Sequence, residues 1–98
     1  MFEVRQHDIG TTLIVHGSLD INTAPALAEA IDRILATRPT QVAVDLTPLD
    51  LIDSSGVAAL VKLYKGVRSG GGVIAIAGAR DQPLAIFRLL RMDRVFDL

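Results

Sequence analysis

The sequence contains no cysteine and no tryptophan, and its only aromatic residues are one tyrosine and three phenylalanines. The lack of cysteine excludes both a disulfide framework and a thiolate metal site. A net charge of −1 argues against nucleic-acid binding, which depends on many phosphate-neutralising Lys and Arg residues. No apolar run approaches the ~18 residues that cross a bilayer, and the first residues lack a signal-peptide pattern. We therefore expect one soluble cytoplasmic domain over residues 1–98, with no direct contact to nucleic acid or membrane.

The charge that is present is distributed unevenly. Residues 1–53 carry three basic and eight acidic side chains, a net charge of −5, whereas residues 54–98 carry seven basic and three acidic ones, a net charge of +4. This asymmetry is typical of solvated helix faces in the second half. Half of the residues are hydrophobic, which is enough for one compact core in a chain of this length.

Two short strand-like runs open the chain. Phe2–Gln6 and Thr11–His16 flank a turn that contains Asp and Gly, and this pattern predicts a β-hairpin. A helix is predicted next. Pro25 is compatible with its first turn, because the missing N–H of proline would have had no partner there. The helix is predicted to extend to about Thr37. Its apolar stripe is Leu27, Ala30, Ile31, Ile34 and Leu35.

Strands and helices alternate in the rest of the chain. Val42–Leu46 and Val73–Ala77 are short apolar runs that predict buried strands, with an amphipathic helix between them. A further helix begins near Asp81, and Val95–Leu98 is predicted as a final edge strand. The inner face of the further helix is predicted to hold Leu84, Phe87 and Leu90.

The predicted element order is ββαβαβαβ. Strands that alternate with helices imply a mostly parallel sheet joined by right-handed crossovers. We therefore predict an α/β fold with a single mixed sheet, an N-terminal hairpin and helices packed on the sheet.

The residues Asp53-Ser54-Ser55-Gly56 lie where a strand region gives way to a helix. Asp53 and the two serines are predicted at the N-cap and in the first turn. Free N–H groups and the positive end of the helix dipole would accommodate a phosphate on either serine. The motif lacks the Gly-x-Ser-x-Gly frame of a nucleophile elbow, and no general base is suitably placed. Local physics fits an ordinary helix cap as well, and it does not choose between the serines.

No pattern in the sequence predicts a metal or cofactor site. His7 and His16 lie in the predicted hairpin, with no carboxylate at a metal-ligand or catalytic-triad spacing. Gly70-Gly71-Gly72 follows a helix and precedes a strand, whereas a phosphate loop has its glycines between a strand and a helix. We expect no metal, no cofactor and no catalytic residue.

Three segments resemble the STAS domain family, in particular its stand-alone anti-sigma factor antagonists. They are Gly17–Asp20 followed by Asn22-Thr23, the segment Val42–Ile52, and Asp53–Val57. The resemblance implies a binding protein and not an enzyme. It implies that an anti-sigma factor with serine kinase activity phosphorylates Ser55, and that a serine phosphatase reverses this. The unphosphorylated form would bind the anti-sigma factor and so release a sigma factor.

The resemblance also implies which residues meet the partner. Asp20 matches a family position that faces the kinase, and Asp53 matches the acidic residue that precedes the acceptor. The expected partner surface further contains Ser54, Asn22, Thr23 and Asp50. The chain departs from the family pattern at Ser18, where an acidic residue is common, and in the link from Leu90 to Val95, which is shorter than usual.

Two alternative functions stay open besides the anti-sigma factor antagonist. In each case we expect the protein to be a monomer. A STAS domain also occurs as a subunit of a sensory complex or transport system, where the same helix end would bind a partner without phosphorylation. A small nucleotide-binding or hydrolytic protein would use Ser55 and Asp53 directly. Such an enzyme would turn over ATP on its own, whereas a passive substrate would not.

Overall fold

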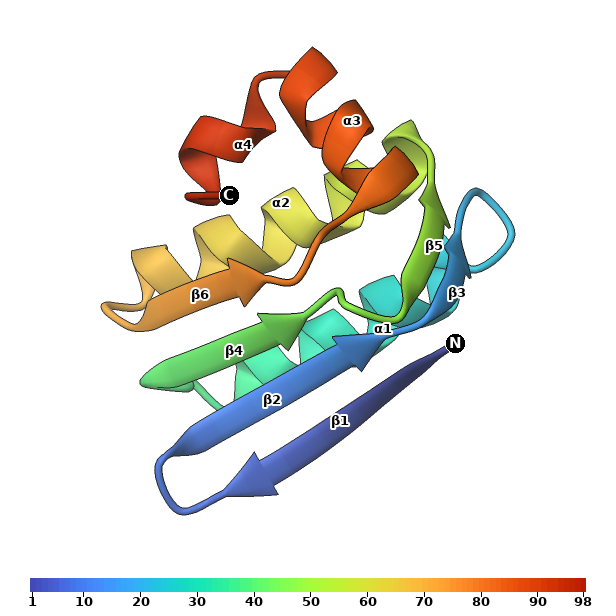
Figure 1. The fold of residues 1–98 in the computed structure, drawn as a ribbon. Coiled ribbons are helices and arrows are strands. Elements are labelled where there is room, and N and C mark those ends of the chain that lie inside the picture. The colour runs from blue at the N-terminus through green and yellow to red at the C-terminus, as the bar shows by residue number, and fades with distance from the viewer.

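The computed structural model describes residues 1–98 as six strands and four helices (Figure 1). The elements are β1 (Phe2–His7), β2 (Gly10–Val15), β3 (Gly17–Leu19), α1 (Ala24–Ala36), β4 (Gln41–Asp45), β5 (Leu49–Ile52), α2 (Ser54–Ser69), β6 (Val73–Ala77), α3 (Asp81–Leu89) and α4 (Met92–Val95). None of the helices combines the length and the apolar character that crossing a membrane requires.

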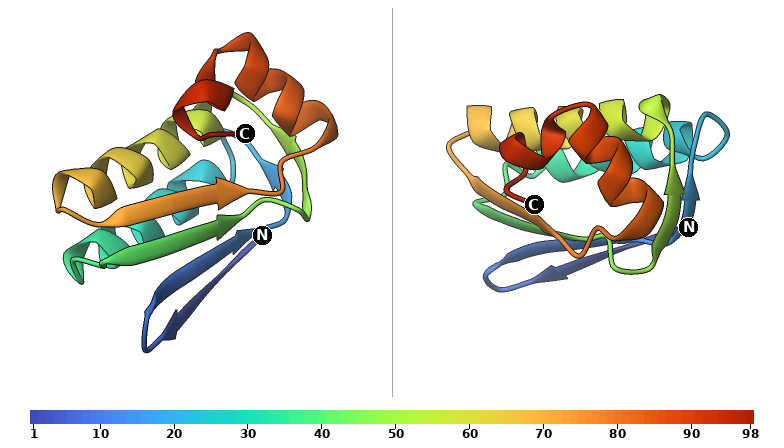
Figure 2. Two further views of the ribbon diagram at one scale, coloured as in Figure 1. Left: turned by 60° about the vertical axis from the view of Figure 1, so that its left-hand side comes forward. Right: turned by 45° about the horizontal axis from the view of Figure 1, so that its top comes forward.

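The main sheet has four strands in the order β1-β2-β4-β6. β1 and β2 form the predicted antiparallel hairpin, and β2, β4 and β6 run parallel. α1 and α2 lie together on one face of this sheet, and the other face carries no helix (Figures 1 and 2). Because the parallel strands point the same way, their carboxyl ends meet at one end of the sheet. The chain enters α1 and α2 from that end.

Two short strands were not predicted, and they form a second sheet. β3 and β5 pair in parallel, with Leu19 opposite Ile52. The chain therefore leaves the main sheet after β2 and again after β4, and each time it adds a strand before its next helix. The predicted order ββαβαβαβ and the single sheet are corrected accordingly. The two strands escaped prediction because they have only three and four residues. In addition, β3 begins with Gly17 and β5 directly follows Pro48, and both residue types are typical of turns.

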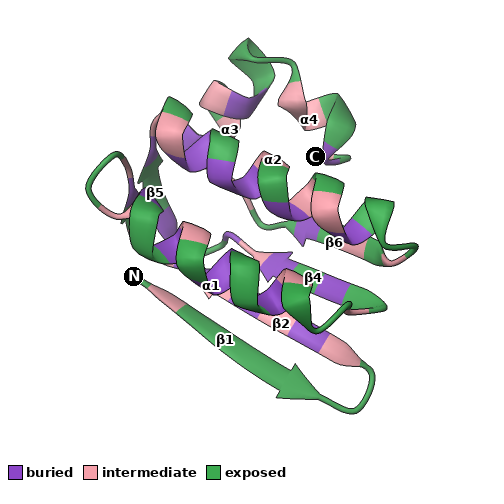
Figure 3. Cartoon of the chain, turned by 180° about the vertical axis from the view of Figure 1, so that it is seen from behind, coloured by how far each residue is buried: buried purple, intermediate pink, exposed green.

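The core lies between the main sheet and the two helices, whose inner faces are buried (Figure 3). The predicted stripe of α1 is buried, except that Leu35 is half-buried. α2 contributes Leu60 and Leu63, which are fully buried. β6 is at an edge of the sheet, so the expectation that it is a buried strand holds for Ile76 alone. The expected end of α2 at its glycines is confirmed, with Gly71 in the left-handed region (φ 85°).

The prediction of a final strand over Val95–Leu98 is wrong. The chain forms the short helix α4 instead, which turns the buried ring of Phe96 towards Tyr64 and Phe87, with ring centroids 5.4 and 5.6 Å apart. Aromatic pairs at this separation are stabilising, and the N–H of Leu98 donates to the carbonyl of Asp93 (2.7 Å), so the C-terminal residues need no sheet edge. Leu90 is 47% exposed and does not belong to the inner face of α3, because that helix ends one residue earlier.

Candidate functional site

The N-terminus of α2 is capped by Asp53, as predicted. Asp53 Oδ1 accepts hydrogen bonds from the N–H groups of Ser55 (2.9 Å) and Gly56 (3.2 Å). The backbone carbonyl of Asp53 accepts a third from Val57 N–H (3.1 Å). The expectation that free N–H donors would hold a phosphate here is therefore corrected for Ser55 and Gly56, because Asp53 already accepts from the N–H groups of both residues.

The second carboxylate oxygen of Asp53 connects the helix end to the loop between β3 and α1. Asp53 Oδ2 accepts a hydrogen bond from Ile21 N–H (3.1 Å), and Asp53 N–H donates to the carbonyl of Leu19 (3.1 Å). One acidic side chain thus caps α2 and fixes the loop beside it. Neither the sequence pattern nor the family resemblance predicted this second bond.

The two serines differ in their surroundings. Ser54 is exposed, whereas Ser55 is half-buried and opens onto a groove of about 320 Å³ between α1 and α2. Neither hydroxyl is hydrogen-bonded within the chain, so each is available to an outside group. The rest of the groove lining consists of Ile21, Ala24, Pro25, Ala28, Ala58, Ala59 and Lys62.

Asp20, Asn22 and Thr23 form a compact turn in the same loop. Asp20 Oδ1 accepts hydrogen bonds from the N–H groups of Asn22 (2.9 Å) and Thr23 (3.2 Å), which is an Asx turn. The hydroxyl of Thr23 accepts from Asp20 N–H (2.9 Å) and donates to the carbonyl of Ser18 (2.9 Å). Asp20 therefore has a structural role in this loop, whatever it contacts outside the chain.

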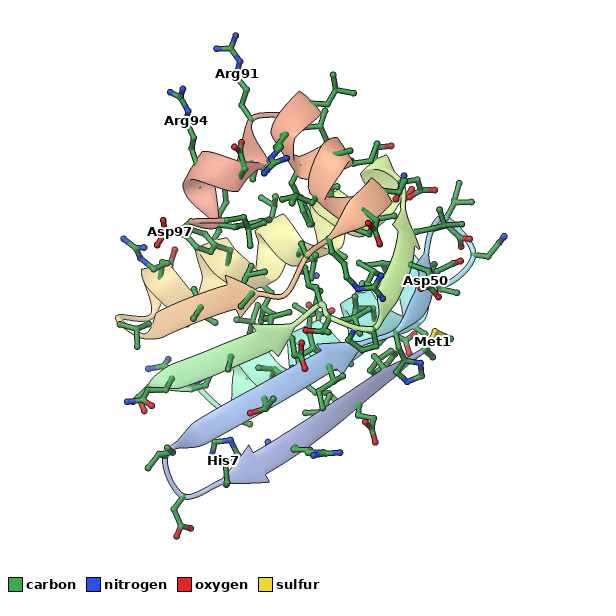
Figure 4. All side chains as sticks on the ribbon, viewed as in Figure 1. Met1, His7, Asp50, Arg91, Arg94 and Asp97 are labelled. Atoms are coloured by element: carbon green, nitrogen blue, oxygen red, sulfur yellow. The ribbon has the colours of Figure 1, made fainter.

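Asp50 belongs to a different part of the surface. Its side chain projects from β5 (Figure 4), and one oxygen lies 4.0 Å from a guanidinium nitrogen of Arg80, just before α3. Arg80 also donates to the carbonyl of Thr47 (3.0 Å) and pairs with Asp81 at 2.8 Å. The structure thus groups Asp53 with Ser55 and the 20–23 turn, while Asp50 is paired towards α3.

Gly56 is the third residue of α2 and lies where the helix comes closest to the small sheet. A Cβ atom at this position would be 2.7 Å from both Cγ and the carbonyl oxygen of Leu19, and 2.8 Å from Cγ1 of Ile52. Only glycine permits this approach without a shift of the neighbouring atoms. The sequence signal was a glycine inside a helical pattern, which often marks close packing.

The other titratable groups do not gather around the serines. His7 Nε2 lies 3.0 Å from Thr12 Oγ1, and His16 contacts the N-terminal amine. No three His, Asp or Glu side chains converge in a way that could hold a metal ion. The hydroxyl and then the N–H of Thr47 lower the pKa of Asp45 below its usual 3.8, but Asp45 is at the end of β4, outside the site.

Fold and site together define a small α/β binding domain, with a capped helix end that presents two unbonded hydroxyls beside a groove. The chain belongs to the STAS domain family: the model described as "Mlab, STAS domain" matches residues 2–98. It is similar to the anti-sigma-F factor antagonist RsfB of Mycobacterium tuberculosis, with 30% identity over 99 residues that cover 97% of this chain and 77% of the relative.

Solved structures give the same assignment. A crystal structure of an anti-sigma factor antagonist from Mycobacterium paratuberculosis matches with a TM-score of 0.87 and 26% identity, over 98% of this chain and 81% of that one. The unphosphorylated form of the anti-sigma factor antagonist SpoIIAA matches with a TM-score of 0.75 and 16% identity, over 97% of both chains. At that identity the second match supports the fold alone. The α/β STAS fold predicted from the sequence is confirmed.

Proposed function

We propose that this protein is an anti-sigma factor antagonist whose binding surface is switched by phosphorylation of Ser55. The observation that carries the proposal is the unbonded Ser55 hydroxyl, half-buried at the groove between α1 and α2. Its relatives named as anti-sigma factor antagonists support the choice of partner. The partner is an anti-sigma factor with serine kinase activity, and a serine phosphatase restores the binding form in the cytoplasm.

The binding surface consists of the helix end and the 18–23 loop beside it. Ile21 is 69% exposed and lines the same groove as Ser55, so it offers an apolar contact next to the hydroxyl. Asp20, Asn22, Thr23 and Ser54 surround it with polar groups. Asp53 contributes by holding the loop against the helix, and Asp50 meets the partner at the margin of the surface.

A phosphate on Ser55 would change the charge of this surface while leaving the fold in place. It adds about −1.5 to −2 charge at pH 7 close to the carboxylate of Asp53. Since Asp53 already accepts from the N–H groups of Ser55 and Gly56, the helix end has few donors left to neutralise the phosphate. The phosphate therefore remains at the mouth of the groove, where its bulk and hydration oppose the partner.

The other two functions receive less support. A nucleotide-binding or hydrolytic role for Ser55 needs a base, and both carboxylate oxygens of Asp53 accept bonds from backbone N–H groups. A STAS subunit of a transport system would use the same groove without phosphorylation. A solved structure of a sulfate transporter family protein from Wolinella succinogenes has the same fold at 18% identity. A likeness at this identity concerns the fold and not the role.

The test compares the two serines as substrates of the anti-sigma factor kinase purified from the source cell. Ser55→Ala should abolish phosphate incorporation, while Ser54→Ala, the matched control one residue earlier, should retain it. Affinity of the phosphorylated protein for the kinase should fall at least tenfold, about 1.4 kcal/mol. Incorporation that survives Ser55→Ala and disappears in Ser54→Ala would move the site. Phosphate release from ATP by the protein alone would support the enzymatic alternative.

A further inference from the structure

The side chain of Gln82, in the first turn of α3, pairs with the backbone of Ile52, the last residue of β5. Gln82 Oε1 accepts a hydrogen bond from Ile52 N–H (2.9 Å), and Gln82 Nε2 donates to the carbonyl of Ile52 (2.9 Å). One carboxamide thus satisfies both backbone groups of a residue that is thirty positions away in the sequence.

This pair of bonds closes an edge of the small sheet. β5 bonds β3 on one side, and Asp53 N–H continues that ladder to the carbonyl of Leu19. Backbone groups of successive residues in a strand point to opposite sides, so those of Ile52 point away from β3. Gln82 meets them there, in the place of a neighbouring strand. Figure 1 shows the first turn of α3 beside β5.

The bonded residue lies immediately before the functional site. Ile52 is 3% exposed and leads directly into Asp53, which caps α2 and fixes the 20–23 turn. A change in the path of Ile52 therefore changes where the Asp53 carboxylate and the Ser55 N–H meet. Arg80 adds a second contact from the same segment, because its Nε donates to the carbonyl of Thr47 just before β5.

We propose that Gln82 is a positioning residue that holds the N-terminus of α2 in the conformation in which Ser55 is presented to its partner. The effect on Ser55 rests on the function proposed above, whereas the effect on the helix end does not. The carboxamide also couples the C-terminal unit of α3 and α4 to the site, because α3 carries both Gln82 and the core residue Phe87.

The first arm of the test measures backbone amide exchange in the free protein. Gln82→Met keeps the length of the side chain and removes both bonds. Exchange of the Ile52 N–H should become roughly tenfold faster, which is the effect expected from losing the net stabilisation of a hydrogen bond. The N–H groups of Ser55 and Gly56, which Asp53 caps, should speed up as well, by at least about threefold. Gln6→Met, at an exposed position of β1, is the matched control and should change none of these rates.

The second arm measures phosphorylation by the purified anti-sigma factor kinase. If Gln82→Met lowers the fraction of molecules in the presented conformation, KM rises by the same factor while kcat stays unchanged. Gln82→Glu retains the acceptor for Ile52 N–H and loses the donor, so it should fall between the wild type and Gln82→Met in both arms. This variant also keeps the proposal testable if Gln82→Met lowers overall stability.

The two arms separate the two proposals. Faster exchange at Ile52 with unchanged rates at Ser55 and Gly56 would show that Gln82 seals a strand edge and positions nothing, which overturns the inference. If the wild type accepts no phosphate while the exchange rates change as expected, the proposed function fails and the positioning of the helix end holds. An equal loss of kcat and kcat/KM would also contradict positioning of the free substrate.

Discussion

Replacing Gly56 by alanine should destabilise the protein, although glycine-to-alanine changes within helices usually do the opposite. Alanine is favoured over glycine by up to ~1 kcal/mol in a helix interior. At this position, however, the new methyl group would lie 2.7 Å from the carbonyl oxygen of Leu19. Overpacking of this kind costs about 1–3 kcal/mol. A backbone oxygen has no rotamer to escape into, so we expect the upper half of that range.

Gly66 offers a matched control in the same helix. A Cβ atom there would lie 2.6 Å from both terminal methyl carbons of Leu35, which is half-buried. A flexible side chain at the surface can turn aside at little cost. Gly66→Ala should therefore be neutral or stabilising by up to ~1 kcal/mol. The two substitutions are chemically identical, but the obstacles at Gly56 include a backbone oxygen, whereas those at Gly66 all belong to one side chain.

Urea unfolding gives the comparison directly. After the propensity gain is subtracted, Gly56→Ala should lower the free energy of unfolding by about 1–2 kcal/mol, with an unchanged m-value. In a thermal scan this corresponds to a decrease of roughly 4–16 °C in Tm for a domain of this size. If Gly56→Ala stabilises the protein as much as Gly66→Ala does, the close approach of α2 to the small sheet is not a constraint on this position.

Three further predictions concern charge. Ser55→Asp should keep cooperative unfolding and change stability by no more than about 1 kcal/mol, because attraction to the helix dipole opposes repulsion from Asp53; non-cooperative unfolding would show that the serine is part of the packing. Asp20→Asn retains an acceptor for the Asx turn, so it should weaken kinase binding in a salt-dependent way without loss of stability, and unchanged affinity at low salt would leave Asp20 a purely structural role. Thr47→Val should raise the lowered pKa of Asp45: the stabilisation from this carboxylate is present above its unfolded-state pKa and is lost as pH falls through the lower folded-state pKa. The variant should therefore lose less stability than the wild type between about pH 5 and pH 2 in urea titrations, and identical losses would contradict the assignment.

The helix cap was predictable because its determinants are local. Asp53 precedes the helix directly, and a short acidic side chain reaches the N–H groups two and three residues ahead. The stripe of α1 was predictable for the same reason, because helical periodicity depends on neighbours three and four residues apart. Sequence reasoning therefore located the candidate serines and the helix that presents them.

The remaining features depend on contacts between distant residues. Val95–Leu98 is a short, mostly apolar run with a β-branched and an aromatic residue, as in a strand, but packing of Phe96 on Tyr64 and Phe87 favours a helical turn. The hydrogen bonds from Ile21 to Asp53 and from Gln82 to Ile52 join residues that are 32 and 30 positions apart in the sequence. No local pattern indicates that a loop amide or a helix side chain will meet a particular strand.

The turn between β1 and β2 is a suitable position for attaching a label to this protein. Asp8 and Ile9 are exposed, and they lie at the opposite end of the main sheet from the N-terminus of α2 (Figure 1). A fluorophore or surface tether introduced at this turn would stay clear of the Ser55 groove during a binding experiment. Since the chain has no cysteine, a single Ile9→Cys substitution would provide one thiol for labelling, and the partner's arrival could be followed on an otherwise unmodified molecule.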